Sequence, residues 1–125
     1  MNETKILILI YSNLFKVPNP PSFIAEECTT DAKTSTIILS WQHQQQQPKI
    51  NGNSSSVQGF LLEVDDGTHE GHFKEVYCGV ETMCQINGLV ANSIYNARVK
   101  AFNQAGFSDY SQIISVAASP STCYL

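Results

Sequence analysis

Short apolar runs separated by turn residues fill most of this chain, and no window of 11 or more residues has apolar residues at the helical period. Residues 35–42, 58–65 and 94–103 alternate between apolar and polar, as strands with one buried face do. We predict strands over residues 22–29, 35–42, 58–65, 72–79, 83–86, 94–103 and 110–117. Strands at this spacing, joined by Gly or Asn turns, indicate an all-β chain folded as a β-sandwich.

The chain divides at a group of prolines that begins at Pro18. Before it, Lys5 to Phe15 is apolar without regular alternation and does not resemble the rest. We predict a non-domain N-terminal segment at residues 1–17, a sandwich domain at 18–118 and a C-terminal tail at 119–125. Inside the domain, residues 44–56 are rich in glutamine and serine and are expected to form a polar loop.

Charge and hydropathy exclude two classes of partner. Seven Lys and Arg stand against eleven Asp and Glu, for a net charge of −4. Surfaces that bind nucleic acid or anionic membranes need clustered Lys and Arg, so we expect neither partner. The longest apolar run, Ile6 to Ile10, is far shorter than the roughly 20 residues of a spanning helix, so we expect no membrane insertion.

The structural core is predicted from the apolar faces of the alternating strands and from one corner between strands. Tyr95 follows Leu89 by six residues at the start of a predicted strand. At such a corner a tyrosine buries its ring and returns its hydroxyl to the backbone upstream. The predicted core residues are Trp41, Phe60, Leu62, Leu89, Tyr95 and Val99.

Several motifs together resemble one family of sandwiches. Trp41 lies on the second predicted strand, with no pair of cysteines around it. The other motifs are Pro20-Pro21-Ser22, Gly59-Phe60, Leu89 to Tyr95, Arg98 to Asn103 and Gly106-Phe107-Ser108. From Pro18 to Ala118 the chain resembles a fibronectin type III domain, with Ala91 where the family usually has proline. The resemblance implies a seven-stranded antiparallel, immunoglobulin-like β-sandwich.

A second set of motifs is more specific. It consists of Glu26 to Thr29, Leu62 to Gly67, Phe73 to Tyr77, Glu81 to Cys84 and Tyr95 to Asn103. These segments are similar to the fibronectin type III domain of the tripartite-motif E3 ubiquitin ligases, in their neuronal, cytoskeleton-associated branch. In that family a coiled coil mediates self-association, a SPRY domain follows, and RING and B-box zinc modules carry the ligase activity. None of these is recognisable in this sequence, so the resemblance implies a fragment.

Candidate metal sites do not have suitable spacing. His69, His72, Cys78 and Cys84 are ligand types for zinc, but a turn followed by a strand gives no reason for them to converge. Asp65-Asp66-Gly67 lacks the spacing of a calcium loop and indicates a hairpin turn. We expect no metal site and no cofactor.

Catalytic constellations are not apparent either. Glu26 and Glu27 are adjacent on a predicted strand, so they should point to opposite faces and not act as an acid/base pair. The sequence has no nucleophile elbow, no phosphate loop and no cysteine with a histidine placed to activate it. We therefore expect no catalytic residue and no enzymatic activity in this chain.

A possible interaction face is formed by charges on two strands that neighbour each other in the family's sheet. Glu63 and Asp65 lie on one strand, and Arg98 and Lys100 lie on the other. All four alternate with core residues and are expected to point away from the core. They form either a cross-strand charge ladder worth tenths of a kcal/mol per pair or a surface that faces a partner.

We expect a non-catalytic protein-interaction or spacer module in the cytoplasm, associated with the cytoskeleton through its parent, with an unidentified protein partner. The four cysteines are expected to be reduced, because the chain is apolar enough to fold without disulfides. The alternative is an extracellular adhesion or receptor module. It is favoured by glycosylation acceptor patterns at Asn2 and Asn53 and by the apolar N-terminal run.

Overall fold

The computed structural model describes residues 16–31, 33, 35–44, 57–65, 71–90 and 93–118. The predicted tail, almost all of the predicted N-terminal segment and most of the polar loop lie outside the described residues. None of the described residues belongs to a helix of the length and apolarity that a bilayer crossing requires. The elements are β1 (Ser22–Phe23), the 3-10 helix η1 (Ala25–Glu27), β2 (Thr29–Asp31), β3 (Thr36–Gln42), β4 (Gly59–Asp65), β5 (Phe73–Gly79), β6 (Met83–Ile86), β7 (Ser93–Asn103), β8 (Gly106–Phe107) and β9 (Ile114–Ala118).

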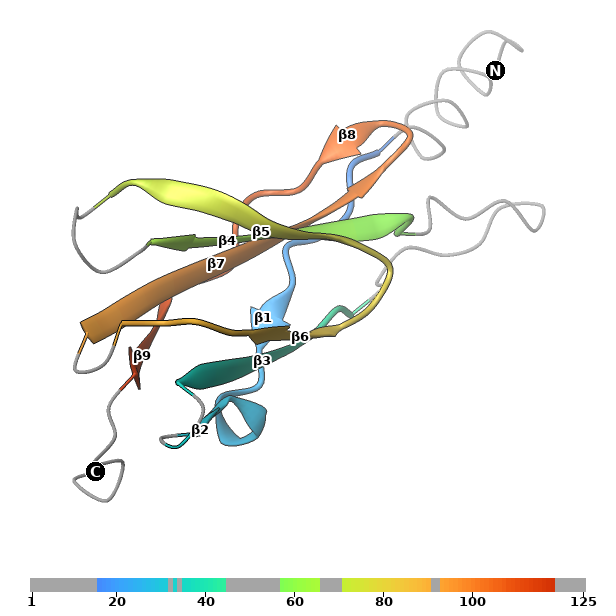
Figure 1. Ribbon diagram of the computed structural model, residues 1–125. Coiled ribbons are helices and arrows are strands. Elements are labelled where there is room, and N and C mark those ends of the chain that lie inside the picture. The colour runs from blue at the N-terminus through green and yellow to red at the C-terminus, as the bar shows by residue number, and fades with distance from the viewer. Residues whose placement is uncertain are drawn as a thin grey trace, which may run out of the picture.

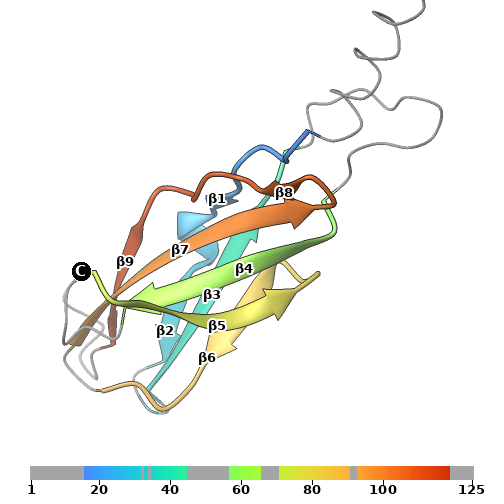
Figure 2. The same ribbon diagram turned by 90° about the horizontal axis from the view of Figure 1, so that it is seen from above.

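The strands form two antiparallel sheets that pack face to face, as Figure 1 and Figure 2 show. In one sheet β3 pairs with β6 on one side and with β1 and β2 on the other. In the other sheet β5 pairs with β4, β4 pairs with β7, and β7 also pairs with β8 and β9. The predicted all-β sandwich is confirmed. The additional segments arise because the first predicted strand is interrupted and the short β8 was not predicted.

The core lies between the sheets and is built from alternate residues of β3, β4 and β7. These residues are Ile37, Leu39, Trp41, Phe60, Leu62, Val64, Tyr95, Ala97, Val99 and Ala101, and none is more than 6% exposed. The ring of Trp41 has centroid distances of 6.4 Å to Phe23, 6.0 Å to Phe60 and 6.1 Å to Tyr77. Leu89, also predicted for the core, is partly buried and packs against this cluster.

The first predicted strand, residues 22–29, is not continuous. Its middle forms η1, which is closed by a hydrogen bond of 2.9 Å from the Glu27 amide to the Ile24 carbonyl. Ala and Glu are depleted in strands, so this sequence has little preference to continue one. The expectation that Glu26 and Glu27 point to opposite faces of a strand is therefore wrong, since both are exposed on one turn.

The thiol of Cys28 replaces a strand contact where the chain leaves η1. Its Sγ donates to the Ser40 carbonyl at 3.5 Å and accepts from the Ser40 amide at 3.4 Å. The Ser40 carbonyl also accepts a hydrogen bond of 2.9 Å from the Ile24 amide, so it is the Ser40 amide that the thiol supplies with a partner at the break. The cysteine allows the interruption without exposing an unpaired edge of β3.

The predicted tyrosine corner forms at the start of β7. Tyr95 is 5% exposed, and its hydroxyl accepts a hydrogen bond of 2.8 Å from the Val90 amide. The ring thus belongs to the core, while the hydroxyl holds the β6–β7 connection against the sandwich.

We expect Tyr95→Phe to lower the free energy of unfolding by about 0.5–1.5 kcal/mol, the usual net value of one hydrogen bond. The ring and its packing are kept, and Val90 is 58% exposed, so water can replace the hydroxyl as the partner of its amide. The fluorescence of Trp41, the single tryptophan, follows urea unfolding in both proteins. An unchanged midpoint would show that the hydroxyl contributes nothing to stability.

Candidate interaction face

The face of β4 and β7 that points away from the core carries a hydrogen-bonded ion pair. Glu63 and Arg98 lie directly opposite each other in the strand register. Arg98 donates from Nε and Nη2 to Glu63 Oε1, each at 2.8 Å, and the Tyr110 hydroxyl donates to Oε2 at 3.0 Å. The Glu63 side chain is only 14% exposed. Both of its carboxylate oxygens are engaged, so the pair is more ordered than a typical surface salt bridge.

Aromatic rings alternate with the two cations on this face. The Arg98 guanidinium carbon lies 4.1 Å from the Phe73 ring centre and 3.8 Å from the Tyr110 ring centre. Lys100 Nζ lies 4.1 Å from the Phe107 ring centre and 4.7 Å from that of Tyr110. We call these five residues the cation–aromatic ladder, and the face that carries them the ladder face. Each contact of this kind contributes about 0.5–1 kcal/mol at an exposed site.

Two serines hold Tyr110 in the ladder. Between β8 and β9 the chain runs beside β7, and the Ser108 amide donates to the Ala101 carbonyl at 2.8 Å, as Ser111 does to Val99 at 2.7 Å. In the opposite direction, the amides of β7 donate to the serine hydroxyls and not to backbone carbonyls. The Ala101 amide donates to Ser108 Oγ at 2.9 Å, and the Val99 amide donates to Ser111 Oγ at 3.0 Å. Both serines are buried. This irregular pairing places the intervening Tyr110 over the cations of β7.

The open end of the ladder face is aromatic. Phe107 is 51% exposed and meets Phe102 edge-on at a centroid distance of 5.6 Å. The Phe102 ring lies over Gly59, where an added Cβ would come within 2.5 Å of Phe102 Cζ. Glycine at this position therefore leaves room for the ring. Next to it, the half-buried Leu61 lies opposite Lys100 in the register.

Three of the four residues predicted for an interaction face lie on the ladder face, namely Glu63, Arg98 and Lys100. The prediction is wrong for Asp65, which is 1% exposed. Its Oδ2 accepts a hydrogen bond of 3.1 Å from the Gly71 amide, across the connection between β4 and β5. The carboxylate is thus used to close a hairpin and is not presented to a partner.

The aromatic residues and the serines of this face were not predicted from the sequence. The sequence predicts one strand over residues 110–117, but β9 begins only at Ile114. A signal was present in Phe107-Ser108 and Tyr110-Ser111, where an aromatic residue followed by serine occurs twice, three residues apart. The irregular segment uses this repeat to present both rings outward and both hydroxyls inward.

The zinc-type ligands named from the sequence are placed on different sheets. Cys78 lies exposed on β5, whereas Cys84 is half-buried on β6 of the other sheet. His72 is exposed before β5, and His69 lies outside the described residues. In the part of the chain that the structure describes, no three His, Cys, Asp or Glu side chains come together as a metal site would require.

The three described cysteines are free thiols that differ in environment. Burial raises the pKa of Cys28, an effect opposed by its hydrogen bond to Ser40 and reinforced by the nearby carboxylates of Glu27 and Glu26. Burial also raises the pKa of Cys84. A raised pKa lowers the fraction of reactive thiolate at neutral pH.

We expect iodoacetamide to modify Cys78 well before Cys28 and Cys84 in the folded protein, because Cys78 is exposed and the other two are shielded and less ionised. Peptide mapping by mass spectrometry at successive times separates these sites from Cys123. The same labelling in urea is the control, where the three rates should converge. Labelling of Cys28 or Cys84 ahead of Cys78 in the folded state would contradict the structure.

Comparison with known proteins agrees with this architecture. Residues 19–117 match the fibronectin type III domain family, and the chain belongs to that family. Among solved structures, the sixth fibronectin type III domain of human fibronectin type III domain containing protein 3 superposes with a TM-score of 0.60 at 21% identity. That comparison covers 84% of this chain and 86% of the other.

Two curated relatives are much longer than this chain. Over 99 residues it is 43% identical to the E3 ubiquitin-protein ligase TRIM9 of Drosophila melanogaster, covering 79% of this chain and 12% of the relative. It is 32% identical over 73 residues to fibronectin type-III domain-containing protein 3a of Gallus gallus, covering 58% of this chain and 6% of the relative. The sequence thus fits the fibronectin type III domain of a tripartite-motif ligase, as its motifs predict.

Proposed function

We propose that this domain is a non-catalytic protein-interaction module of a tripartite-motif E3 ubiquitin ligase and that the ladder face binds its protein partner. The observation that carries the proposal is the cation–aromatic ladder, which ends in the exposed ring of Phe107. Tyr and Arg are enriched among the residues that dominate binding energy at protein interfaces. A spacer alone has no need of such a face.

The order of the ladder also supports a binding role. Arg98 is held by two rings and by Glu63, and Tyr110 is held by its hydroxyl and by the serines on either side. Side chains that are already fixed lose little conformational entropy when a partner binds. The net charge of −4 favours a protein over a nucleic acid as that partner.

The place of the domain in a larger protein is inferred from the resemblance to TRIM9. In this proposal the parent is a RING-type ligase of the cytoplasm, associated with the cytoskeleton, and self-association takes place through a coiled coil outside this chain. The genomic sequence on both sides of the reading frame tests the parentage. RING, B-box, coiled-coil and SPRY exons are expected there, and a signal peptide with further extracellular modules would contradict it.

Capture from an extract of the source cells tests the binding face. The immobilised protein is compared with Phe107→Asp and Lys100→Glu, and with Met83→Asp as the control, because Met83 is 60% exposed on the other sheet. We expect one set of proteins to be retained by the wild type and by Met83→Asp and to be lost with the two ladder variants. Equal retention by all four would overturn the proposal.

A further inference from the structure

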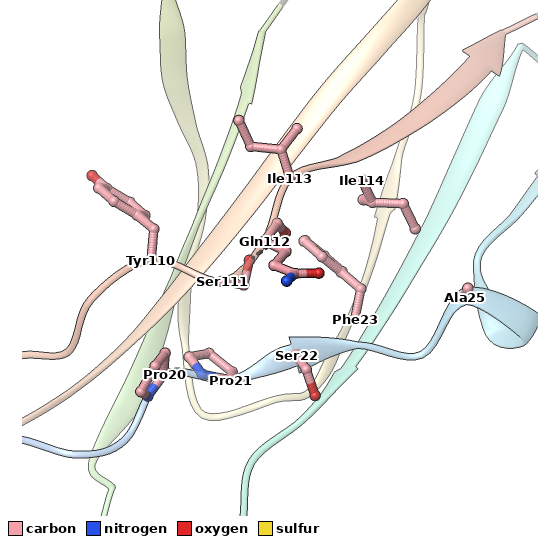
Figure 3. A pocket seen from close by; sticks show the side chains of 10 residues that line it. All are labelled: Pro20, Pro21, Ser22, Phe23, Ala25, Tyr110, Ser111, Gln112, Ile113 and Ile114. Carbon is pink, nitrogen blue, oxygen red and sulfur yellow. Dashed lines mark hydrogen bonds between the residues drawn. The ribbon is translucent and has the colours of Figure 1, made fainter.

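A groove of about 460 Å³ separates β1 from residues 110–114, which lead into β9 (Figure 3). Its two walls come from different sheets, since β1 pairs with β3 and β9 pairs with β7. This volume falls within the roughly 300–1,000 Å³ of clefts that hold ligands in proteins. Figure 3 shows that the lining side chains come from two chain segments that run past each other, so the groove suits a chain that lies along it.

The lining of the groove is uncharged and largely apolar. Phe23 and Ile114 pack against the core and form its floor, while Ile113 lies at the edge with its side chain directed away from β1 and is 56% exposed. The side chain of Gln112 also lines the groove, and no other described residue forms a hydrogen bond with its amide. Apolar side chains of a ligand can be buried here beside the side-chain amide of Gln112, which can both donate and accept hydrogen bonds.

Carboxylates flank this apolar groove at both ends. Glu26 and Glu27 follow the lining residue Ala25, and Asp109 precedes the lining residue Tyr110. Glu26, Glu27 and Asp109 are exposed, and no Lys or Arg in the described ranges forms an ion pair with them. The two ends therefore attract positive charge, and the centre attracts apolar surface.

We propose that the groove binds an extended peptide with apolar side chains at its centre and Lys or Arg at both ends. The apolar side chains pack against Phe23 and Ile114, and the basic side chains pair with Glu26 and Glu27 at one end and with Asp109 at the other. Among the described residues β1 and β9 each pair with a single strand, so each presents a backbone edge to an extended chain. This site is separate from the ladder face, although Tyr110 contributes to both.

The test uses two synthetic peptides on the full chain. One has Ile, Pro and Leu at its centre and two Lys at each end, and the other has Glu in place of every Lys. Titration followed by amide chemical shifts should give binding of the Lys peptide only, with the largest shifts at Ser22, Ala25, Gln112 and Ile113. Affinity should fall as salt is raised, because the flanking charges are exposed.

Substitutions locate the site. Ile113→Asp should weaken binding of the Lys peptide about tenfold or more, since it places a charge on the apolar rim. Ile94→Asp is the matched control, because Ile94 is 60% exposed but does not line the groove. The affinity of this variant for the Lys peptide should equal that of the wild type. The double variant Glu26→Gln with Glu27→Gln lies on an exposed turn, so it should fold normally and weaken binding about threefold to tenfold.

Several results would overturn the proposal. They are no binding of either peptide, equal binding of both peptides, or shifts that map to the ladder face instead of the groove. Undiminished binding by Ile113→Asp would do the same, as would concentration-dependent self-association that Ile113→Asp abolishes, since the occupant would then be a second copy of the chain. If the capture experiment shows that the ladder face binds no partner, the result of the peptide titration still stands on its own, because the titration uses defined peptides.

Discussion

Trp41→Ala is expected to reduce the free energy of unfolding by about 3–5 kcal/mol, the usual range for removing a buried aromatic side chain. Trp41 is 1% exposed, and its ring packs against Phe23 in its own sheet and against Phe60 and Tyr77 in the other. Truncation leaves a cavity between two sheets whose backbones cannot move together to fill it. Urea unfolding followed by far-UV circular dichroism measures the loss, because the substitution removes the chain's single tryptophan fluorophore.

Trp41→Phe is the control for this experiment. Trp41 Nε1 is buried without a hydrogen-bond partner in the part of the chain that the structure describes. Phenylalanine keeps an aromatic ring in the core and removes this unpaired donor, so its loss of stability should be clearly smaller than that of alanine. A loss below about 1 kcal/mol for Trp41→Ala would contradict a position at the centre of the core.

The second large effect is expected from replacing Ser108 and Ser111 together with alanine, which should cost about 2–4 kcal/mol. The two hydroxyls accept hydrogen bonds from the amides of Ala101 and Val99 on β7. Both residues are buried in the centre of the sheet. Alanine leaves both amides unpaired away from water, and this costs more than the net value of two ordinary hydrogen bonds. Urea unfolding followed by Trp41 fluorescence measures the change.

Ser115→Ala supplies the matched control on the same edge of the sheet. The Ser115 hydroxyl donates to Asn96 Oδ1 at 2.6 Å, but the residue is exposed and water can replace the bond. Its loss should stay within about 0.5 kcal/mol. If Ser115→Ala proved as costly as the double substitution, the special role of the two buried hydroxyls would be refuted.

The regular strands could be predicted from the sequence, whereas the interruptions could not. Alternation over β3, β4 and β7 predicts both the strands and their core residues, because each has one face that must be buried. The break at η1 depends on the thiol of Cys28 bonding to the backbone of Ser40, twelve residues away. The bond from the Cys28 thiol to the backbone has no periodic trace in the sequence around residue 28.

The candidate site was predictable to a similar extent. Glu63 and Arg98 follow from the pairing of neighbouring strands, since residues opposite each other on one face meet. Phe73 and Tyr110 come from other parts of the chain, and they reach Arg98 only through the β5 pairing and the irregular segment before β9. Burial of Asp65 could not be foreseen either, because its exposure is decided by how the hairpin closes.

Photo-crosslinking in cells tests the central claim, that the ladder face binds a protein partner, most directly. A photoreactive amino acid replaces Phe107 on the ladder face or, as the control, Met83 on the other sheet, since both residues are more than half exposed. Irradiation should give a discrete adduct from position 107 and none from position 83, and the adduct should disappear when Lys100→Glu is added. The absence of an adduct at position 107, or adducts of equal yield at both positions, would contradict the account.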